Sequence, residues 1–295
     1  MVKPYIQNGV DLKLQDRELN IEGIRLHYAE WNNGPQSGAK NVLLIHGATA
    51  NNRWWTGLGN HLSRQGFRVI APDLRGRGLS SKPAHGYGVH FHVADLLTLL
   101  DSLDLDSVSV VGHSLGGGIG LCMAALFPAR VRKLVVVDVG IRIPADTLQA
   151  LSASLNRLGQ VYPSIDAYLE MCKRMPYFKW SDFWDAFYRY DAEVRPGGTV
   201  VSRASKSGIQ EEANTSATLN SEVLIPMIRA PTLFLRATEG LLGPDRGLIL
   251  PREEADRLHA LITGSQVREI PKTNHYTIIL SPEFEPAVSD FLKKD

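Results

Sequence analysis

Six short apolar runs recur along the chain, and they constrain its fold more than any other feature. They are rich in Val, Ile and Leu and are separated by longer segments with helical periodicity. Runs this short and this continuously apolar are typical of parallel strands buried on both faces of a sheet. They cover residues 41–47, 67–73, 107–113, 133–139, 231–237 and 266–271. The pattern predicts an α/β fold with a doubly wound, mostly parallel sheet, and partial alternation over 19–30 predicts an antiparallel hairpin at its edge.

One long interval breaks this alternation. From about residue 141 to residue 227 no apolar strand run occurs, and helical, aromatic and polar stretches follow one another. We therefore predict one core domain, residues 1–140 and 228–295, with a helical insertion over residues 141–227. Trp184 lies in the insertion, in an aromatic stripe with helical spacing. That stripe packs the insertion onto the core, and some of its rings could also face a substrate.

The composition argues against several classes of partner. Lys and Arg (32) and Asp and Glu (31) nearly cancel, so no basic excess favours nucleic acid or an anionic membrane. Two cysteines are too few for a disulfide framework or a cysteine-based zinc site, which favours a reducing, cytoplasmic compartment. The first residues lack the apolar core of a signal peptide, and no apolar run is long enough to cross a membrane. The sequence gives no indication of the oligomeric state.

A serine lies between glycines where the run 107–113 ends. Residues 110–117 read VVGHSLGG, with Gly112 and Gly116 two positions either side of Ser114, and a helical pattern follows. A strand that turns into a helix this abruptly strains its turn residue, and the glycines remove side chains that would collide. Backbone N–H groups at the start of the helix then point toward the serine. This context is that of a nucleophile elbow, so we predict that Ser114 is a nucleophile.

A serine hydroxyl needs a base within hydrogen-bond reach, and the base needs an acid that orients it. In the chain order expected of such an elbow, the acid and then a histidine follow the serine. His113 is adjacent in the chain and is expected to point away from the serine, and His259 lies in a surface-type helix. His275 directly follows the last apolar run and precedes a helix, so we predict that it is the base.

Three carboxylates remain open as the acid. Glu239 is the first choice, because it lies just past the end of the run 231–237, in the loop TEGLLGPD. Asp138, at the end of the preceding run, could reach the same histidine. Asp245 lies farther along the Glu239 loop.

Five motifs follow one another along nearly the whole chain, namely LLIHGATA (43–50), APDLRGRGLSSKP (71–83), VVGHSLGGGIG (110–120), the loop with Glu239, and TNHYT (273–277). Together they resemble the α/β-hydrolase superfamily, in the branch with a helical cap. The resemblance implies that residues 141–227 form this cap and that the backbone N–H groups of Ala48 and Leu115 form the oxyanion hole. His46 is expected to fix that loop rather than to take protons. The family's acid is more often an aspartate near residue 240, so a glutamate at 239 departs from its pattern.

The stretch DLRGRG (73–78) lacks the Lys-Ser/Thr ending of a phosphate-binding loop. We interpret it as a turn stabilised by a contact between Asp73 and an arginine. Trp54 and Trp55 follow the oxyanion loop and either pack or, with Trp184, form walls of a substrate pocket.

These residues predict acyl transfer to water. His275 takes the proton of Ser114, the alkoxide attacks an ester-like carbonyl, and the acyl-enzyme is then hydrolysed. This chemistry needs neither a metal nor an organic cofactor. Serine at the elbow argues against the haloalkane dehalogenase and epoxide hydrolase branches, which resemble this fold but use a carboxylate nucleophile. We predict a carboxylesterase for a small to medium, fairly apolar ester, with a lactone as a close alternative. A carbon–carbon bond hydrolase on the same triad and a slowly hydrolysing, ligand-binding receptor remain open.

Overall fold

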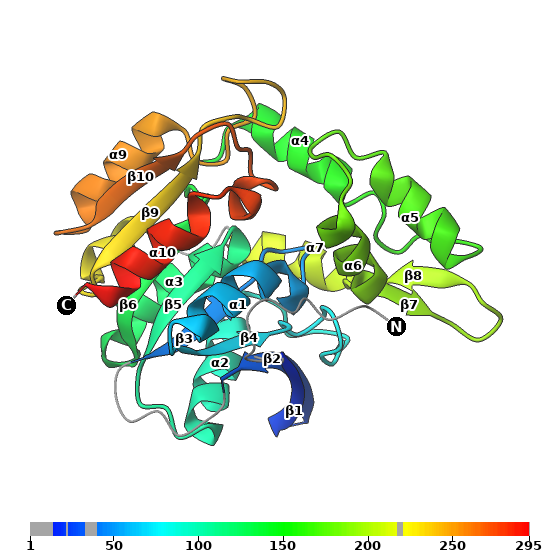
Figure 1. The fold of residues 1–295 in the computed structure, drawn as a ribbon, viewed down its shortest axis with the longest axis horizontal. Coiled ribbons are helices and arrows are strands. Elements are labelled where there is room, and N and C mark those ends of the chain that lie inside the picture. The colour runs from blue at the N-terminus through cyan, green and yellow to red at the C-terminus, as the bar shows by residue number, and fades with distance from the viewer. Residues whose placement is uncertain (1–13, 22, 33–39, 217–220, 295) are drawn as a thin grey trace.

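Eight strands form one sheet in the order β1-β2-β4-β3-β5-β6-β9-β10. A computed structural model describes residues 14–21, 23–32, 40–216 and 221–294 of the chain (Figure 1). β1 pairs with β2 and β2 with β4 in antiparallel fashion, and all other neighbours are parallel. The strands are β1 (Gln15–Ile21), β2 (Ile24–Trp31), β3 (Asn41–Ile45), β4 (Arg68–Pro72), β5 (Val108–His113), β6 (Val131–Val137), β9 (Thr232–Ala237) and β10 (Gln266–Ile270). The predicted α/β fold is confirmed, since each of the six apolar runs overlaps a strand and β1 and β2 form the edge hairpin.

The sheet is buried on both faces because helices cover each of them. Leu43 and Ile45 of β3 face a core shared with α2 (Val89–Ser102), α3 (Leu115–Leu126) and α9 (Arg252–Leu261). Val42 and Leu44 face the opposite core, with α1 (Thr56–Arg64) and α10 (Phe284–Lys293). Every residue of β5 is buried, which explains its continuous apolar run.

The segment between β6 and β9 is mostly helical, as the broken alternation indicates. Its elements are α4 (Ala145–Ser154), α5 (Ile165–Lys173), α6 (Asp182–Asp191), β7 (Ala192–Val194), β8 (Val200–Ser202), α7 (Lys206–Ser216) and α8 (Ser221–Leu224). Figure 1 shows α4, α5, α6, β7 and β8 of this segment in green and yellow-green, above and to the right of the sheet. The antiparallel pair β7–β8 was not expected, because two strands of three residues are too short to produce a recognisable alternation. We call this segment the cap.

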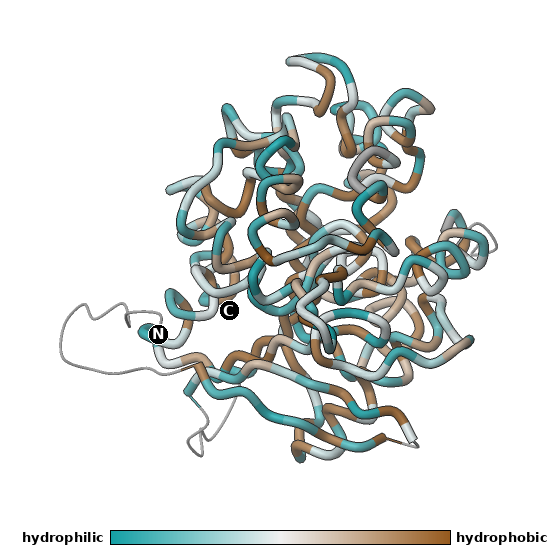
Figure 2. Tube along the Cα trace, turned by 90° about the vertical axis from the view of Figure 1, so that its right-hand side faces the viewer, coloured by the Kyte–Doolittle hydropathy of each residue, from teal (hydrophilic) through white to brown (hydrophobic). Residues whose placement is uncertain are grey.

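Figure 2 shows hydrophobic stretches gathered inside the trace and hydrophilic stretches along much of its outside. Among the residues placed by the structure, no helix combines the length and the apolar character that crossing a bilayer requires.

Candidate active site

Ser114 occupies the single residue between β5 and α3. Its backbone has φ 54° and ψ −122°, a region that L-residues rarely adopt and that stores strain. Three backbone hydrogen bonds hold it: the Ser114 N–H donates to Val137 O (3.0 Å), and Ser114 O accepts from the N–H groups of Gly117 (2.8 Å) and Gly118 (3.1 Å). The side chain is partly exposed. This geometry is the one expected of the elbow.

Two glycines make the turn possible, because at both positions another backbone segment lies too close to leave room for a side chain. A Cβ on Gly112 would lie 2.1 Å from Gly116 O, and a Cβ on Gly116 would lie 2.0 Å from Ile45 O. No side chain fits at these distances, so α3 can begin against the end of β3 only because both positions are glycine.

Gly116→Ala is therefore expected to destabilise the fold, because its methyl group would displace the backbone of β3. Overpacking of this kind costs about 1–3 kcal/mol of unfolding free energy, measurable by urea denaturation. Gly118→Ala is the matched control in the same helix, since nothing lies within 4 Å of its Cβ position. The control is expected to stabilise the protein by roughly 0.4–1 kcal/mol. Equal stability of the two variants would contradict this explanation.

His275 lies in the loop after β10 and contacts Asp138, which directly follows β6. The distance from His275 Nδ1 to Asp138 Oδ2 is 2.9 Å, and both residues are buried. Asp138 Oδ1 accepts a hydrogen bond from the Ala237 N–H at 3.0 Å, which fixes the carboxylate. Because a carboxylate only accepts, Nδ1 of His275 carries a proton, and in the neutral imidazole the lone pair is then on Nε2. That tautomer is the one a general base requires.

The structure does not bring the first-choice acid to the histidine. Glu239 is exposed, and its backbone N–H donates to Thr273 O (2.8 Å), but its carboxylate makes no hydrogen bond to His275. Asp245 is exposed as well. The choice of Glu239 as the partner of His275 is therefore corrected to Asp138. Asp138 directly follows β6, the immediate neighbour of the elbow strand β5, and its side chain is buried against His275. The backbone of Glu239 adjoins the His275 loop, but its side chain is exposed.

His113 takes part in this site, although its position in the sequence predicted only that it points away from the serine. Its Nε2 lies 3.0 Å from the backbone O of His275 and, since a carbonyl only accepts, donates to it. Its ring lies between those of His275 (centroids 4.4 Å apart) and Trp54 (4.8 Å). Burial lowers the pKa of His113 well below its usual range, and the adjacent His275 lowers it further. A neutral imidazole thus supports the loop that carries His275.

The serine and the imidazole lie at the same edge of the sheet but are not hydrogen-bonded to each other. His113, which contacts His275, directly precedes Ser114 in the chain. No hydrogen bond joins the Ser114 hydroxyl to His275, and catalytic hydrogen bonds are often long until a substrate is bound.

Two backbone donors adjoin the serine. A Cβ on Gly47 would lie 3.3 Å from Ser114 Cβ, so the loop with Ala48 touches the elbow. Within the described part of the chain, the N–H groups of Ala48 and Leu115 have no hydrogen-bond partner. Unpaired donors beside a serine are what an oxyanion hole needs.

His46 fixes this loop, in agreement with its expected role. Its Nε2 accepts a hydrogen bond from the Leu74 N–H (3.0 Å), so its Nδ1 carries the proton and donates to Gly47 O (2.8 Å). Burial lowers the pKa of His46 to about 4, and the ring is neutral near pH 7.

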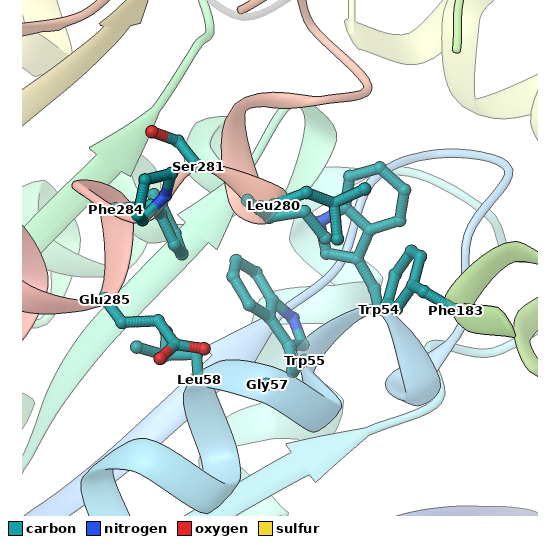
Figure 3. Close-up of a pocket in the computed structure, with 11 residues that line it drawn as sticks. Trp54, Trp55, Gly57, Leu58, Phe183, Leu280, Ser281, Phe284 and Glu285 are labelled. Carbon is teal, nitrogen blue, oxygen red and sulfur yellow. The ribbon is translucent and has the colours of Figure 1, made fainter. Parts of the chain in front are cut away.

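The three tryptophans pack within the molecule. Trp54, Trp55 and Trp184 are all buried, and the rings of Trp54 and Trp184 meet edge to face at 5.8 Å. Trp54 and Trp55 also line a pocket of about 240 Å³. Figure 3 shows Trp55 between Phe284 on one side and Trp54 on the other. Neither Ser114 nor His275 lines this pocket. A contact between these tryptophans and a substrate stays a prediction.

Asp73 does not form the predicted contact with an arginine. Its buried carboxylate accepts hydrogen bonds from the Asn52 N–H (2.7 Å) and the Tyr190 hydroxyl (2.6 Å) and lies 3.0 Å from His27 Nδ1. The two arginines of this stretch form ion pairs with other carboxylates, namely Arg75 with Asp95 and Arg77 with Glu212. Asp73 thus joins the core to helix α6 of the cap through Tyr190.

We expect the folded protein to lose stability at alkaline pH, because the buried His27 beside Asp73 loses its proton there. Burial opposes the charge of His27, but Asp16 (3.2 Å) and Asp73 outweigh it and raise its pKa from 6.5 to about 9. The folded state binds this proton more tightly than the unfolded state, so the stabilisation is complete below pH 6.5 and disappears as pH rises through about 9. Urea unfolding between about pH 6 and 10 measures this, and His27→Gln is expected to flatten the decline. If the unfolding free energies of wild type and His27→Gln declined in parallel with rising pH, His27 would not be the group responsible.

Comparison with known proteins places these features in context. The sequence model of one family, described as alpha/beta hydrolase fold, matches residues 40–282. The chain is 36% identical over 269 residues to 2-hydroxy-6-oxo-2,4-heptadienoate hydrolase of Pseudomonas putida, covering 86% of this chain and 90% of that protein. It is 30% identical over 285 residues to 2-(acetamidomethylene)succinate hydrolase of Mesorhizobium japonicum, covering 94% of each. A crystal structure of E-2-(acetamidomethylene)succinate hydrolase matches with a TM-score of 0.80 and 26% identity, covering 96% of this chain and all of that one.

Proposed function

The chain belongs to the alpha/beta hydrolase family, and on that premise we propose that it is a serine hydrolase for small unsaturated carboxylic acids. We propose further that the bond it breaks is a carbon–carbon bond beside a carbonyl group. One observation carries the proposal: strained Ser114 lies beside the unpaired N–H groups of Ala48 and Leu115, at the sheet edge where Asp138 orients His275.

The choice of bond rests on the relatives. One acts on 2-hydroxy-6-oxo-2,4-heptadienoate and the other on 2-(acetamidomethylene)succinate, both of them unsaturated carboxylates by name. The first name favours the carbon–carbon alternative over the simple carboxylic ester first predicted from the sequence, because 2-hydroxy-6-oxo-2,4-heptadienoate contains neither an ester nor an amide that could be hydrolysed. The second substrate carries an acetamido group, so its name supports only an unsaturated carboxylate as substrate. An enzyme for simple esters shares the same first step, so the two functions differ in the leaving group.

The first step forms a bond between Ser114 Oγ and the carbonyl carbon. Nε2 of His275 takes the hydroxyl proton, and Asp138 stabilises the imidazolium that results. The carbonyl oxygen gains negative charge and accepts hydrogen bonds from the N–H groups of Ala48 and Leu115. Each such donor contributes on the order of 2.7–4 kcal/mol to the transition state.

The second step breaks the bond from the carbonyl carbon to the adjacent carbon. The electron pair leaves with that carbon, which is feasible when conjugation spreads the charge into a second carbonyl or an enoate. The imidazolium of His275 gives its proton to the leaving fragment. Water then attacks the acyl-Ser114 carbonyl with His275 again as base, and a carboxylic acid is released.

A substrate panel tests the choice of bond. We expect kcat/KM for 2-hydroxy-6-oxo-2,4-heptadienoate to exceed that for p-nitrophenyl butyrate and for a simple δ-lactone by at least about tenfold, or about 1.4 kcal/mol. Ser114→Ala gives the uncatalysed background for each compound. Fastest turnover of the butyrate or the lactone would return the assignment to an esterase or a lactonase. Binding without turnover of any of them, measured by calorimetry, would favour a receptor.

A further inference from the structure

Three consecutive carbonyl groups of the loop after His46 each accept a hydrogen bond from a fixed donor. Gly47 O accepts from His46 Nδ1 (2.8 Å), and Ala48 O accepts from Arg77 Nε (2.9 Å). Thr49 O accepts from Arg157 Nη2 (2.8 Å). Because peptide groups are planar, a fixed carbonyl also fixes the N–H of the following residue. The orientation of this loop therefore depends on three side chains.

Two of these donors belong to the core, but the third comes from the cap. His46 follows β3 and Arg77 lies in the loop after β4, whereas Arg157 lies in the turn after α4. The cap thus reaches into the loop that contains Ala48 and touches the elbow at Gly47. Arg157 is 3% exposed, so this contact is shielded from water.

Arg157 is held in place by a buried carboxylate. Its Nε lies 3.7 Å from Oδ2 of Asp191, the last residue of α6. Asp191 also accepts hydrogen bonds from the Tyr168 hydroxyl and from Ser202 Oγ (2.7 Å), so α5 and β8 fix it. A buried ion pair is often no more stable than apolar side chains of the same volume. The pair therefore calls for an explanation other than stability.

The cap also contacts the loop that carries His275. Asn274 Nδ2 donates to Tyr177 O at 2.7 Å, next to His275. The Tyr177 ring stacks on that of Tyr276 with centroids 5.1 Å apart. The cap therefore contacts the loops on both sides of the site, one carrying the base and the other the oxyanion donor.

We propose that Arg157 is a positioning residue that holds the oxyanion loop through Thr49 O, so that transition-state stabilisation depends on the cap. This rests on the proposed hydrolysis at Ser114. When the cap is in place, Arg157 fixes the peptide group between Thr49 and Ala50, while His46 and Arg77 fix the two peptide groups before it. The loop that carries the Ala48 N–H is then held along its length before charge develops on the substrate. If the cap is displaced, Thr49 O loses its donor and the hole loosens. Catalytic competence is thereby coupled to cap closure.

Arg157→Met tests this role, with Arg189→Met as a matched control. Arg189 lies in the same cap, but its ion pair with Asp185 is exposed. We expect Arg157→Met to lower kcat by roughly ten- to hundredfold with KM within about twofold, as a small misplacement of catalytic groups does. Affinity for phenylboronic acid, whose serine adduct places an oxygen in the oxyanion hole, should fall by the same factor. Arg189→Met should change neither quantity.

Three results would overturn the proposal: unchanged kcat and boronate affinity, a change confined to KM, or an equal loss in Arg189→Met. A change in KM alone would make Arg157 a substrate-binding residue. If Arg157→Met does not fold, Arg157→Lys is used, because it retains a positive charge for Asp191. One ammonium group cannot reproduce both contacts of a guanidinium, so an intermediate loss of kcat is expected. Wild-type protein that neither turns over the panel nor binds phenylboronic acid would refute the proposed hydrolysis itself.

Discussion

Ser114→Ala is expected to lower kcat by a factor on the order of 10⁶, the loss typical of removing a triad nucleophile. Alanine cannot form the covalent intermediate, and what remains comes from substrate binding and the backbone donors. The hydroxyl of Ser114 makes no hydrogen bond within the described part of the chain, so the fold should persist. Single-turnover kinetics with the fastest substrate of the panel, together with thermal unfolding, measure both effects.

Ser102→Ala serves as the control for this substitution. Ser102 ends α2, and its hydroxyl donates to Thr98 O at an exposed position (2.8 Å). Its loss should leave kcat within about twofold of wild type, as surface substitutions generally do. If Ser114→Ala retained more than about one percent of the rate, the nucleophile would have to be sought elsewhere.

Asp138→Asn is expected to lower kcat by roughly 10⁴-fold while KM changes little. Asparagine can donate to Nδ1 of His275 instead of accepting from it. The imidazole would then carry its proton on Nε2 and could not act as the base. Because the same side chain also accepts from the Ala237 N–H, thermal unfolding has to be measured with the kinetics.

Glu239→Gln and Asp245→Asn are the matched controls for the acid. Both residues are exposed, so each substitution should leave kcat within about twofold of wild type. The opposite result would be a roughly 10⁴-fold fall of kcat in Glu239→Gln while Asp138→Asn stays active. It would make Glu239 the acid, as first predicted.

Local sequence patterns predicted the parts of this protein that depend on neighbouring residues. The run 107–113 followed by Ser114 between glycines predicted a strand, a strained turn and a helix, and the structure places β5, Ser114 and α3 there. Chain order placed His275 at the same edge of the sheet. These features rest on short-range sterics and on hydrophobic periodicity, which the sequence records directly.

Features that depend on which segments become neighbours could not be predicted in this way. Asp138 lies at the end of one apolar run and Glu239 just after another, and only the structure shows which of the two side chains reaches His275. His113 was expected only to point away from the serine, because nothing in VVGHSLGG indicates that the backbone O of His275 lies 3.0 Å from its Nε2. The contact of Arg157 with Thr49 joins residues 108 positions apart, and no periodicity encodes such a pairing.

Fluorophosphonate labelling followed by peptide mass spectrometry tests most directly whether Ser114 is an activated nucleophile. One phosphonyl group per chain is predicted, on the peptide that contains Ser114. Its attachment should be slowed strongly by His275→Ala and by Asp138→Asn and left unchanged by Glu239→Gln. Labelling of a different residue, or labelling of Ser114 at the same rate without His275, would contradict the account.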